Sequence, residues 1–167
     1  MVDQRELRLY EILKKLSIPY TVYEHEPAFT VEQSKKVAGF VPGAYIKNLF
    51  LKDNTKQLWL VVAPCDTKIN LKELAKRINA PGLRFAQPEL LEQYLGVIPG
   101  AVTPLALMHD TQRAVCVILD ISLLEQSLIG CHPLRNSATL TLSPQDLLTF
   151  INYLGHSVEQ IDVAALL

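Results

Sequence analysis

Cysteine is scarce in this chain, and its three cysteines lie far apart. Cys65, Cys116 and Cys131 form no Cys-x-x-Cys pair, and no histidine stands at zinc-ligand spacing from them. A disulfide framework and a structural zinc site both need closely patterned ligands. The sequence therefore argues against both and predicts buried thiols in a reducing compartment.

Long apolar runs are also missing. No uninterrupted apolar stretch approaches the roughly 18 residues that span a bilayer, and the charged N-terminus has no apolar signal core. With 49% hydrophobic and 20% charged residues among 167, the composition is that of a compact folded protein. We expect a single domain over residues 1–167, in the cytoplasm and away from membranes.

Basic residues are rare in the second half of the chain. Residues 1–84 carry fourteen Lys and Arg against nine Asp and Glu, a balance of +5, whereas residues 85–167 carry two against eight, a balance of −6. This asymmetry allows a basic surface for an anionic partner, without the very basic pI of a dedicated nucleic-acid-binding domain. Charge alone equally allows solvated helix faces.

Several motifs of well-known enzyme classes do not occur. The chain has no Gly-x-x-x-x-Gly-Lys-Ser/Thr phosphate loop, no Gly-x-Gly-x-x-Gly and no Gly-x-Ser-x-Gly elbow. A nucleophilic cysteine stays open because Cys131 precedes His132, although adjacent residues of a strand point to opposite faces. We expect no metal ion and no cofactor.

The most informative stretch that is present covers residues 45–53, Tyr-Ile-Lys-Asn-Leu-Phe-Leu-Lys-Asp. Its consecutive apolar residues at 49–51 predict an interior strand covered on both faces. Lys47 and Asn48 stand at the entry to that strand. Because burying an unpaired ammonium is costly, Lys47 either turns to solvent or has an anionic or carbonyl partner.

Periodicity and end signals predict the remaining elements. Helices are expected over residues 3–16, 31–37, 71–78, 89–94 and 143–154, with a helical turn at 120–125. Strands are expected over residues 20–24, 45–53, 57–63, 82–86, 105–108, 114–119, 128–131 and 138–142. A polar turn at 53–56 makes a hairpin of the two central strands. The result is an α+β fold, a mixed and largely antiparallel sheet surrounded by helices.

Two further stretches complete a candidate site. The segment 96–104 is too rich in Gly and Pro for regular structure, and as a packed loop it exposes main-chain N–H groups for use. His132 lies in a His-Pro-Leu-x-Asn turn. Singly, each feature has a purely structural interpretation: a surface lysine at 47, a simple turn at 100–104 and a hydrogen-bonded, half-buried histidine at 132.

Together these stretches resemble the YbaK/ProX family of trans-editing aminoacyl-tRNA deacylases, relatives of the editing domain inserted in bacterial prolyl-tRNA synthetases. The similarity covers nearly the whole chain and is greatest to the stand-alone ProX or PrdX branch, which clears alanine from proline tRNA. It rests on Tyr-Thr-Val-Tyr-Glu-His at 20–25, Phe-Thr-Val-Glu at 29–32, Lys-Asn-Leu-Phe-Leu-Lys-Asp at 47–53, Pro-Gly-Ala-Val-Thr-Pro at 99–104, His-Pro-Leu-x-Asn at 132–136 and Gly-His at 155–156.

The resemblance implies roles for individual residues. Lys47 corresponds to the family's essential lysine, an electrostatic clamp on the ester carbonyl or a nearby phosphate. The main chain at Gly100, Ala101 and Val102 would stabilise the oxyanion, and the neighbouring ribose hydroxyl would assist the attack. The remaining pocket and substrate-binding residues are Phe29, Val31, Ile46, Asn48, Lys52, Thr103, Pro104 and His132.

The substrate follows from the same resemblance. A synthetase pocket shaped for proline rejects the smaller alanine by only about 1 to 3 kcal/mol, so a second, smaller pocket can remove the error. The expected partners are the acceptor end of mischarged tRNA, of the proline type, and prolyl-tRNA synthetase. Two alternatives stay open: a deacylase for cysteinyl or seryl tRNA, and a non-catalytic module that binds tRNA or a synthetase.

Overall fold

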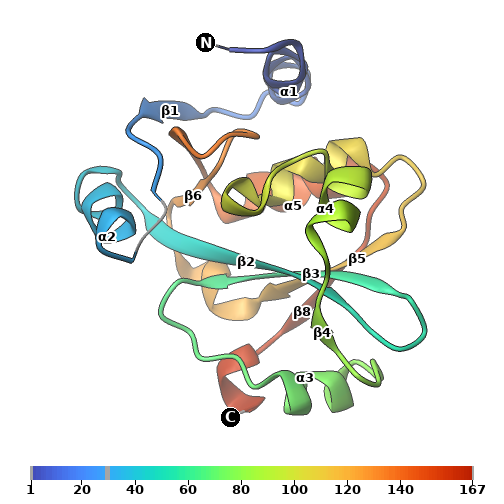
Figure 1. Ribbon diagram of the computed structural model, residues 1–167. Helices are drawn as coiled ribbons and strands as arrows, with labels where there is room; N and C mark the ends of the chain where they lie inside the picture. The colour runs from blue at the N-terminus through green and yellow to red at the C-terminus, as the bar shows by residue number, and fades with distance from the viewer. Residues whose placement is uncertain (1, 29–30, 167) are drawn as a thin grey trace.

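The computed structural model describes residues 2–28 and 31–166, without the side chains of residues 31 and 34. A sheet of eight strands runs through the molecule (Figure 1). Its strands are β1 (Thr21–Glu24), β2 (Ala44–Lys52), β3 (Leu58–Pro64), β4 (Arg84–Phe85), β5 (Val115–Asp120), β6 (Ile129–Cys131), β7 (Ala138–Leu142) and β8 (Val158–Ile161).

The sheet is mixed. Its strands follow the order β1-β7-β6-β2-β3-β5-β8, and β4 pairs separately with β2. The pairs β1–β7, β6–β7, β2–β3 and β2–β4 are antiparallel. The pairs β2–β6, β3–β5 and β5–β8 are parallel. Together with the surrounding helices, this architecture confirms the predicted α+β fold.

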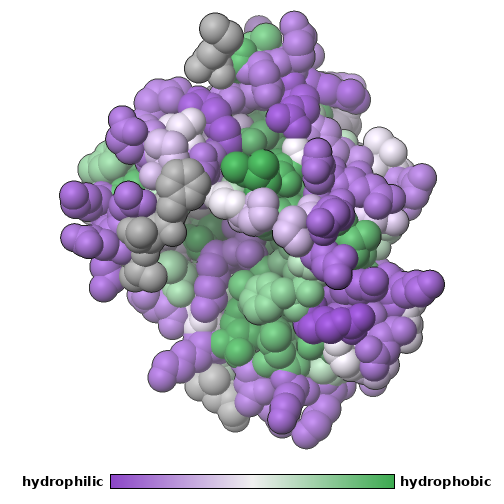
Figure 2. Space-filling view, viewed as in Figure 1, coloured by the Kyte–Doolittle hydropathy of each residue, from purple (hydrophilic) through white to green (hydrophobic). Residues whose placement is uncertain are grey.

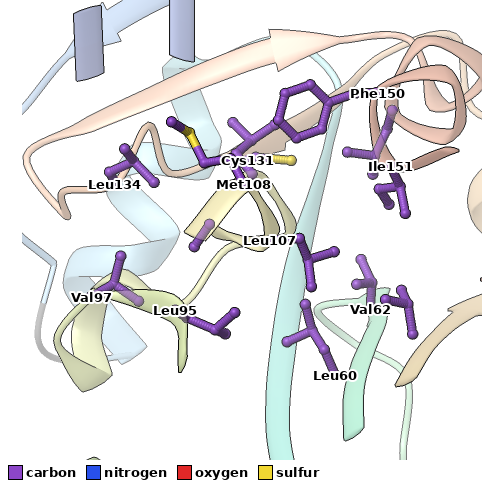
Figure 3. Packing of buried hydrophobic residues seen from close by; sticks show 14 of the residues in the cluster. Leu60, Val62, Leu95, Val97, Leu107, Met108, Cys131, Leu134, Phe150 and Ile151 are labelled. Atoms are coloured by element: carbon purple, nitrogen blue, oxygen red, sulfur yellow. The ribbon is translucent and has the colours of Figure 1, made fainter. Parts of the chain in front are cut away.

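Helices cover both faces of the sheet (Figure 1). They are α1 (Gln4–Lys15), α2 (Val31–Phe40), α3 (Leu71–Arg77), α4 (Pro88–Leu95) and α5 (Pro144–Tyr153), with 3-10 turns η1 (Pro99–Ala101), η2 (Pro104–His109), η3 (Ile121–Glu125) and η4 (Val163–Leu166). The main core packs α1, α4 and α5 against one face, and Figure 3 shows part of it, including Leu60, Leu95 and Phe150. A smaller cluster packs α3 on the other face. No helix among the described residues is long and apolar enough to cross a membrane.

Three helices begin at the caps that the sequence indicates. Asp3 accepts a hydrogen bond from the amide of Glu6 at 3.0 Å, and Asn70 accepts from the amides of residues 72 and 73. Ser143 accepts from the amide of Asp146 at 3.1 Å. These side chains satisfy first-turn donors that lack an acceptor within the helix, which fixes where each helix starts.

The central hairpin turns where the sequence predicts. The amide of Asp53 donates to the carbonyl of Gln57 at 3.1 Å, and the buried Asp53 carboxylate accepts bonds from Thr55, Gln57 and the indole of Trp59. Burial opposes ionisation of Asp53, but these hydrogen bonds outweigh it and hold the pKa of the carboxyl below its ordinary value. The turn is therefore fixed by one buried carboxylate.

Three predicted elements differ from the structure, and one strand was not predicted. The strand expected at 105–108 is wrong, because these buried residues belong to the 3-10 turn η2, which Thr103 caps and Pro104 opens. The strand expected at 82–86 shrinks to Arg84–Phe85. Helix α2 continues past the expected stop at Gly39 to Phe40. β8 was not predicted, because its only buried residue is Ile161 and it has no apolar pattern.

Candidate functional site

Among the described residues, strand β2 pairs with β3 along most of its length and with β6 and β4 only near its two ends. β6 pairs with it at Ala44 and Tyr45, and β4 pairs with it at Leu51 and Lys52. Between these ladders, residues 46–49 have a described strand partner only on the β3 side. The surface is hollowed over this part of β2, between α2 and the segment that follows α4 (Figure 2). We call the unpaired side of residues 46–49 the open edge.

Lys47 and Asn48 flank the open edge from opposite faces of the sheet, because side chains alternate along a strand. Lys47 lies on the face that carries Leu49 and Leu51, and its half-buried ammonium donates a hydrogen bond to the main-chain carbonyl of Thr67. The lysine therefore has a carbonyl partner instead of pointing only to solvent. Thr67 follows β3, and no local sequence pattern indicated this contact.

Asn48 lies on the other face and contacts the Gly/Pro segment directly. Its side-chain amide donates a hydrogen bond to the carbonyl of Val102 at 3.2 Å. The side-chain oxygen Oδ1 of Asn48 is buried and has no hydrogen-bond partner within the described part of the chain. A buried acceptor left unpaired is unfavourable by about 1 to 3 kcal/mol, so this oxygen is a candidate for a bond to substrate or water.

The segment 96–104 contains the 3-10 turn η1 and ends at Pro104, where η2 begins. Gly96 ends α4 in the left-handed conformation at φ 66°, and η1 follows with Gly100 exposed and Ala101 fully buried. The amide of Ala101 donates to the carbonyl of Ile98 at 2.9 Å. That amide is therefore committed inside the turn, which argues against the role expected for it towards an oxyanion.

The amide of Gly100 has a different environment. It lies in the first turn of η1, where N–H groups have no acceptor within the helical turn. Thr103 and Pro104 are buried, and Thr103 caps η2 through a 3.3 Å bond from the amide of Leu105. These two residues therefore shape the segment, and neither presents an exposed surface to a substrate.

His132 follows directly after β6. The parallel ladder between β2 and β6 ends with Gly130 opposite Tyr45. His132 lies two residues after Gly130, and Lys47 lies two residues after Tyr45. The same register therefore brings His132 level with Lys47, just past the end of β6. Its Nδ1 lies 3.0 Å from the carbonyl of Ala138 and so donates to it, which leaves Nε2 with a lone pair. Burial lowers the pKa of His132, so the ring is neutral at pH 7.

A second histidine, which the sequence did not single out as a site residue, lies beside His132. The two ring centroids of His25 and His132 are 6.5 Å apart. His25 is fixed at both nitrogens, by the carbonyl of Glu26 and by the hydroxyl of Thr139, each at 2.8 Å. The only hint in the sequence was the position of His25 at the end of the Tyr-Thr-Val-Tyr-Glu-His stretch.

The other predicted pocket residues are less closely associated. Ile46 is buried in the main core, so its side chain packs under β2 and does not line the open edge. Lys52 pairs with Arg84 at the far end of β2, about 17 Å along the strand from Lys47 at the usual rise per residue. Phe29 and the side chain of Val31 lie outside the described residues, and their assignment to the pocket stays a prediction.

Cys131 does not act with His132 as a nucleophile. Its side chain is buried in the main core, where the lack of water raises the pKa of the thiol to about 12. A thiol of this kind is not ionised at neutral pH. Among the described residues, no group of three or more His, Cys, Asp and Glu side chains could hold a metal ion.

Comparison with known proteins assigns the chain to a family. A family model described as an aminoacyl-tRNA editing domain matches residues 25–150. The chain belongs to the YbaK/ProX family of aminoacyl-tRNA editing domains. The matched region contains Lys47, the segment 96–104 and His132, whereas helix α1 lies outside it.

Other members of the editing-domain family match over most of their length. A protein of Danio rerio named prolyl-tRNA synthetase associated domain-containing protein 1 is 43% identical over 93% of this chain and 85% of its own length. The prolyl-tRNA editing protein ProX of Acetoanaerobium sticklandii is 38% identical over 90% of this chain and 93% of its own. A solved structure described as a proposed trans-editing enzyme for prolyl tRNA synthetase has the same fold, with a TM-score of 0.73 and 20% identity over 96% of this chain and 98% of its own.

Proposed function

We propose that this editing domain is a trans-acting deacylase that hydrolyses the ester of mischarged tRNA, with alanyl-tRNA of the proline type as its substrate. The observation that carries the proposal is the open edge of β2 inside the matched editing domain, with Lys47, the Asn48–Val102 contact and neutral His132 around it.

The choice of substrate follows from the relatives and from size. The relative from Acetoanaerobium sticklandii is named for prolyl-tRNA editing, and the animal relatives carry names that refer to prolyl-tRNA synthetase. A synthetase site built for proline excludes the smaller alanine poorly, because missing methylenes lower affinity by only about 1 to 3 kcal/mol. A separate hydrolytic site that is too small for proline removes this error.

The reaction requires water to add to the ester carbonyl, after which the bond from the carbonyl carbon to the ribose oxygen breaks. Lys47 carries three N–H donors, and the Thr67 carbonyl accepts one of them, so others can reach the ester or an adjacent phosphate. The amide of Gly100 is the main-chain donor of η1 that is free of the turn's own bonding. Donors of this kind contribute on the order of 3 kcal/mol to stabilising an oxyanion.

His132 supplies an acceptor rather than a charge. Its Nδ1 is held by the Ala138 carbonyl, so a substrate hydroxyl or a water can donate only to Nε2. A neutral imidazole in this tautomer can orient the attacking water or the neighbouring ribose hydroxyl. The proton of the attacking water then passes to the ribose oxygen that leaves.

A panel of charged tRNAs tests the proposal. Purified protein is incubated with tRNA of the proline type that carries alanine, cysteine, serine or proline. The amount of acid-precipitable aminoacyl-tRNA that remains is followed over time. Faster loss of alanyl-tRNA than of the other three is expected. A preference for cysteinyl or seryl tRNA would reassign the substrate, and rates equal to buffer for all four would leave a tRNA-binding module without hydrolysis.

A further inference from the structure

Two adjacent residues of α1 contact two different segments around the open edge. The guanidinium of Arg5 donates to the carbonyl of Gly96, which ends α4 and is the first residue of the segment 96–104. The carboxylate of Glu6 binds Arg135, which lies in the turn between His132 and β7. Helix α1, which lies outside the matched editing region, therefore contacts both the end of α4 and the turn that follows His132.

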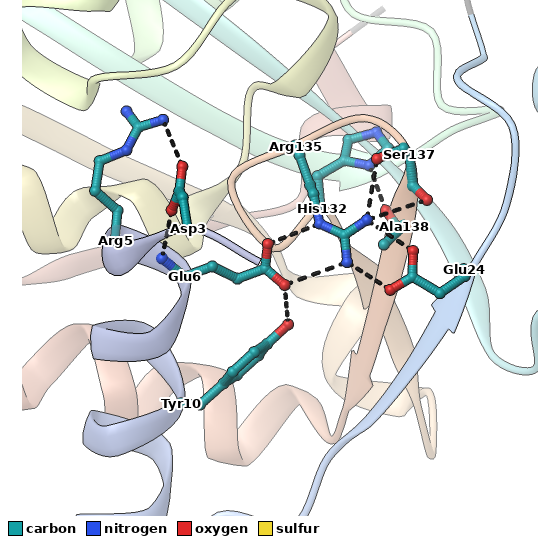
Figure 4. Close-up of polar contacts among 9 residues, drawn as sticks. All are labelled: Asp3, Arg5, Glu6, Tyr10, Glu24, His132, Arg135, Ser137 and Ala138. Carbon is teal, nitrogen blue, oxygen red and sulfur yellow. Dashed lines mark hydrogen bonds and ion pairs between the residues drawn. The ribbon is translucent and has the colours of Figure 1, made fainter. Parts of the chain in front are cut away.

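Arg135 is the centre of this arrangement (Figure 4). Its Nε and Nη2 lie 2.7 and 3.2 Å from the two carboxylate oxygens of Glu6. Its Nη1 and Nη2 lie 2.7 and 2.6 Å from those of Glu24 on β1. The hydroxyl of Tyr10 donates a further bond to Glu6. One guanidinium thus joins α1 and β1 to the turn that follows His132.

The cluster is partly buried and sets one guanidinium between two carboxyl groups. The side chain of Glu6 is 2% exposed and that of Arg135 is 19% exposed, whereas Glu24 is 68% exposed. Hydrogen bonds to Glu24 and Glu6 raise the pKa of Arg135, and the bond from Arg135 lowers the pKa of Glu24. A planar guanidinium satisfies two carboxylates at once, which a lysine cannot reproduce.

The turn that Arg135 holds is the one that orients His132. Arg135 also donates to the hydroxyl of Ser137 at 3.0 Å, and the next residue, Ala138, provides the carbonyl that fixes Nδ1 of His132. The carbonyl of Ser137 accepts the amide of His25 at 3.0 Å. Any shift of the Arg135 side chain is therefore transmitted to the two histidines through one or two residues of main chain.

We propose that Arg135, held by Glu6 of α1 and Glu24 of β1, is a positioning residue that aligns His132 with the open edge. This proposal rests on the proposed function, because it assigns a task to His132 in the same reaction. It predicts that α1 is needed for turnover although α1 lies outside the matched editing region. A purely structural ion cluster would instead affect stability alone.

The experiment compares Arg135→Gln, Arg135→Lys and Glu6→Gln in the full chain, with Arg77→Gln as the matched control. Arg77 forms an exposed pair with Glu159 at 3.4 Å and lies outside the site. Deacylation gives kcat and KM, and hydrogen exchange of residues 132–138 reports the order of the turn. NMR titration of the His132 ring reports its pKa independently of activity.

We expect Arg135→Gln to lower kcat at least tenfold with KM changed less than threefold, to speed exchange at 132–138, and to move the pKa of His132 towards its ordinary value. Arg135→Lys should recover little, because it keeps the charge but loses the two-carboxylate contact. Arg77→Gln should change none of these values. Combining Glu6→Gln with Arg135→Lys should be less than additive, because both act on one cluster.

Three outcomes would overturn the proposal. The first is an unchanged kcat in folded Arg135→Gln, and the second is a wild-type kcat in Arg135→Lys. The third is a loss of activity in each variant that matches its loss of folded protein. Should Arg135→Gln fail to fold, the same measurements on Glu6→Gln decide, since that variant keeps the shape of the side chain. Inactive wild-type protein would refute the proposed function, while the exchange and ring titration would still show whether Arg135 positions His132.

Discussion

Asn48 and Val102, 54 residues apart in the chain, are joined by a 3.2 Å hydrogen bond from the side-chain amide to the main-chain carbonyl. This bond ties the central strand to the segment with Gly100. The lysine that precedes Asn48 is held on the other face of β2 by the carbonyl of Thr67. Two adjacent side chains therefore fix two sides of the open edge, and each can be tested separately.

Replacing Lys47 by Met should abolish most turnover while the protein stays folded. The change keeps the aliphatic stem and removes only the ammonium, so we expect kcat to fall by about 10²- to 10³-fold, the usual loss for one transition-state donor. Single-turnover deacylation and thermal unfolding measure the two effects. Lys14→Met, on the exposed face of α1, is the matched control, and equal activity in the two variants would remove Lys47 from the mechanism.

Asn48→Asp should destabilise the protein more than Asn48→Leu. The aspartate loses the donor to Val102 and sets carboxylate oxygens against a carbonyl, with an expected loss of about 1 to 3 kcal/mol in the free energy of unfolding. The leucine removes both the bond and the unpaired Oδ1, so its loss should be smaller. Urea unfolding at pH 7 compares them, and an aspartate variant as stable as the leucine variant would contradict the observed geometry.

Stability should fall as the pH drops below the ordinary pKa of histidine, and His132 should contribute to this fall. Burial lowers the pKa of His132 in the folded state, so below about 6.5 the unfolded chain binds a proton that the folded chain does not. Above that pH both states are neutral at this residue and it contributes no pH dependence. Urea unfolding at pH 5.5 and 7.5 should show a smaller difference for His132→Gln than for the wild type.

Cys131→Ala should keep turnover. The thiol is buried with a pKa raised to about 12, so it is neither a nucleophile nor a ligand at neutral pH. The loss of its sulfur from the core should reduce the free energy of unfolding by about 1 kcal/mol. Deacylation assays check this directly. A loss of kcat comparable to that of the lysine variant would show that the thiol takes part in the reaction.

Local patterns predicted much of the fold. The caps at Asp3, Asn70 and Ser143 and the hairpin turn at Asp53 act through neighbours within a few residues, so their signals lie in the sequence itself. The wrong prediction of a strand at 105–108 also came from local patterns. The buried run in η2 is apolar at every position, and such a run does not distinguish a strand from a buried helical turn.

The contacts of the candidate site were less predictable than the fold. Sequence patterns indicated the three segments that make up the candidate site: the Lys-Asn strand, the Gly/Pro segment and the histidine turn. The three-dimensional structure was needed to show that Lys47 binds Thr67, that Asn48 binds Val102, and that Arg135 binds Glu6 from 129 residues away. These contacts depend on which edge of β2 is left without a strand and on where α1 packs, because partners far apart in the chain leave no periodic or local signal.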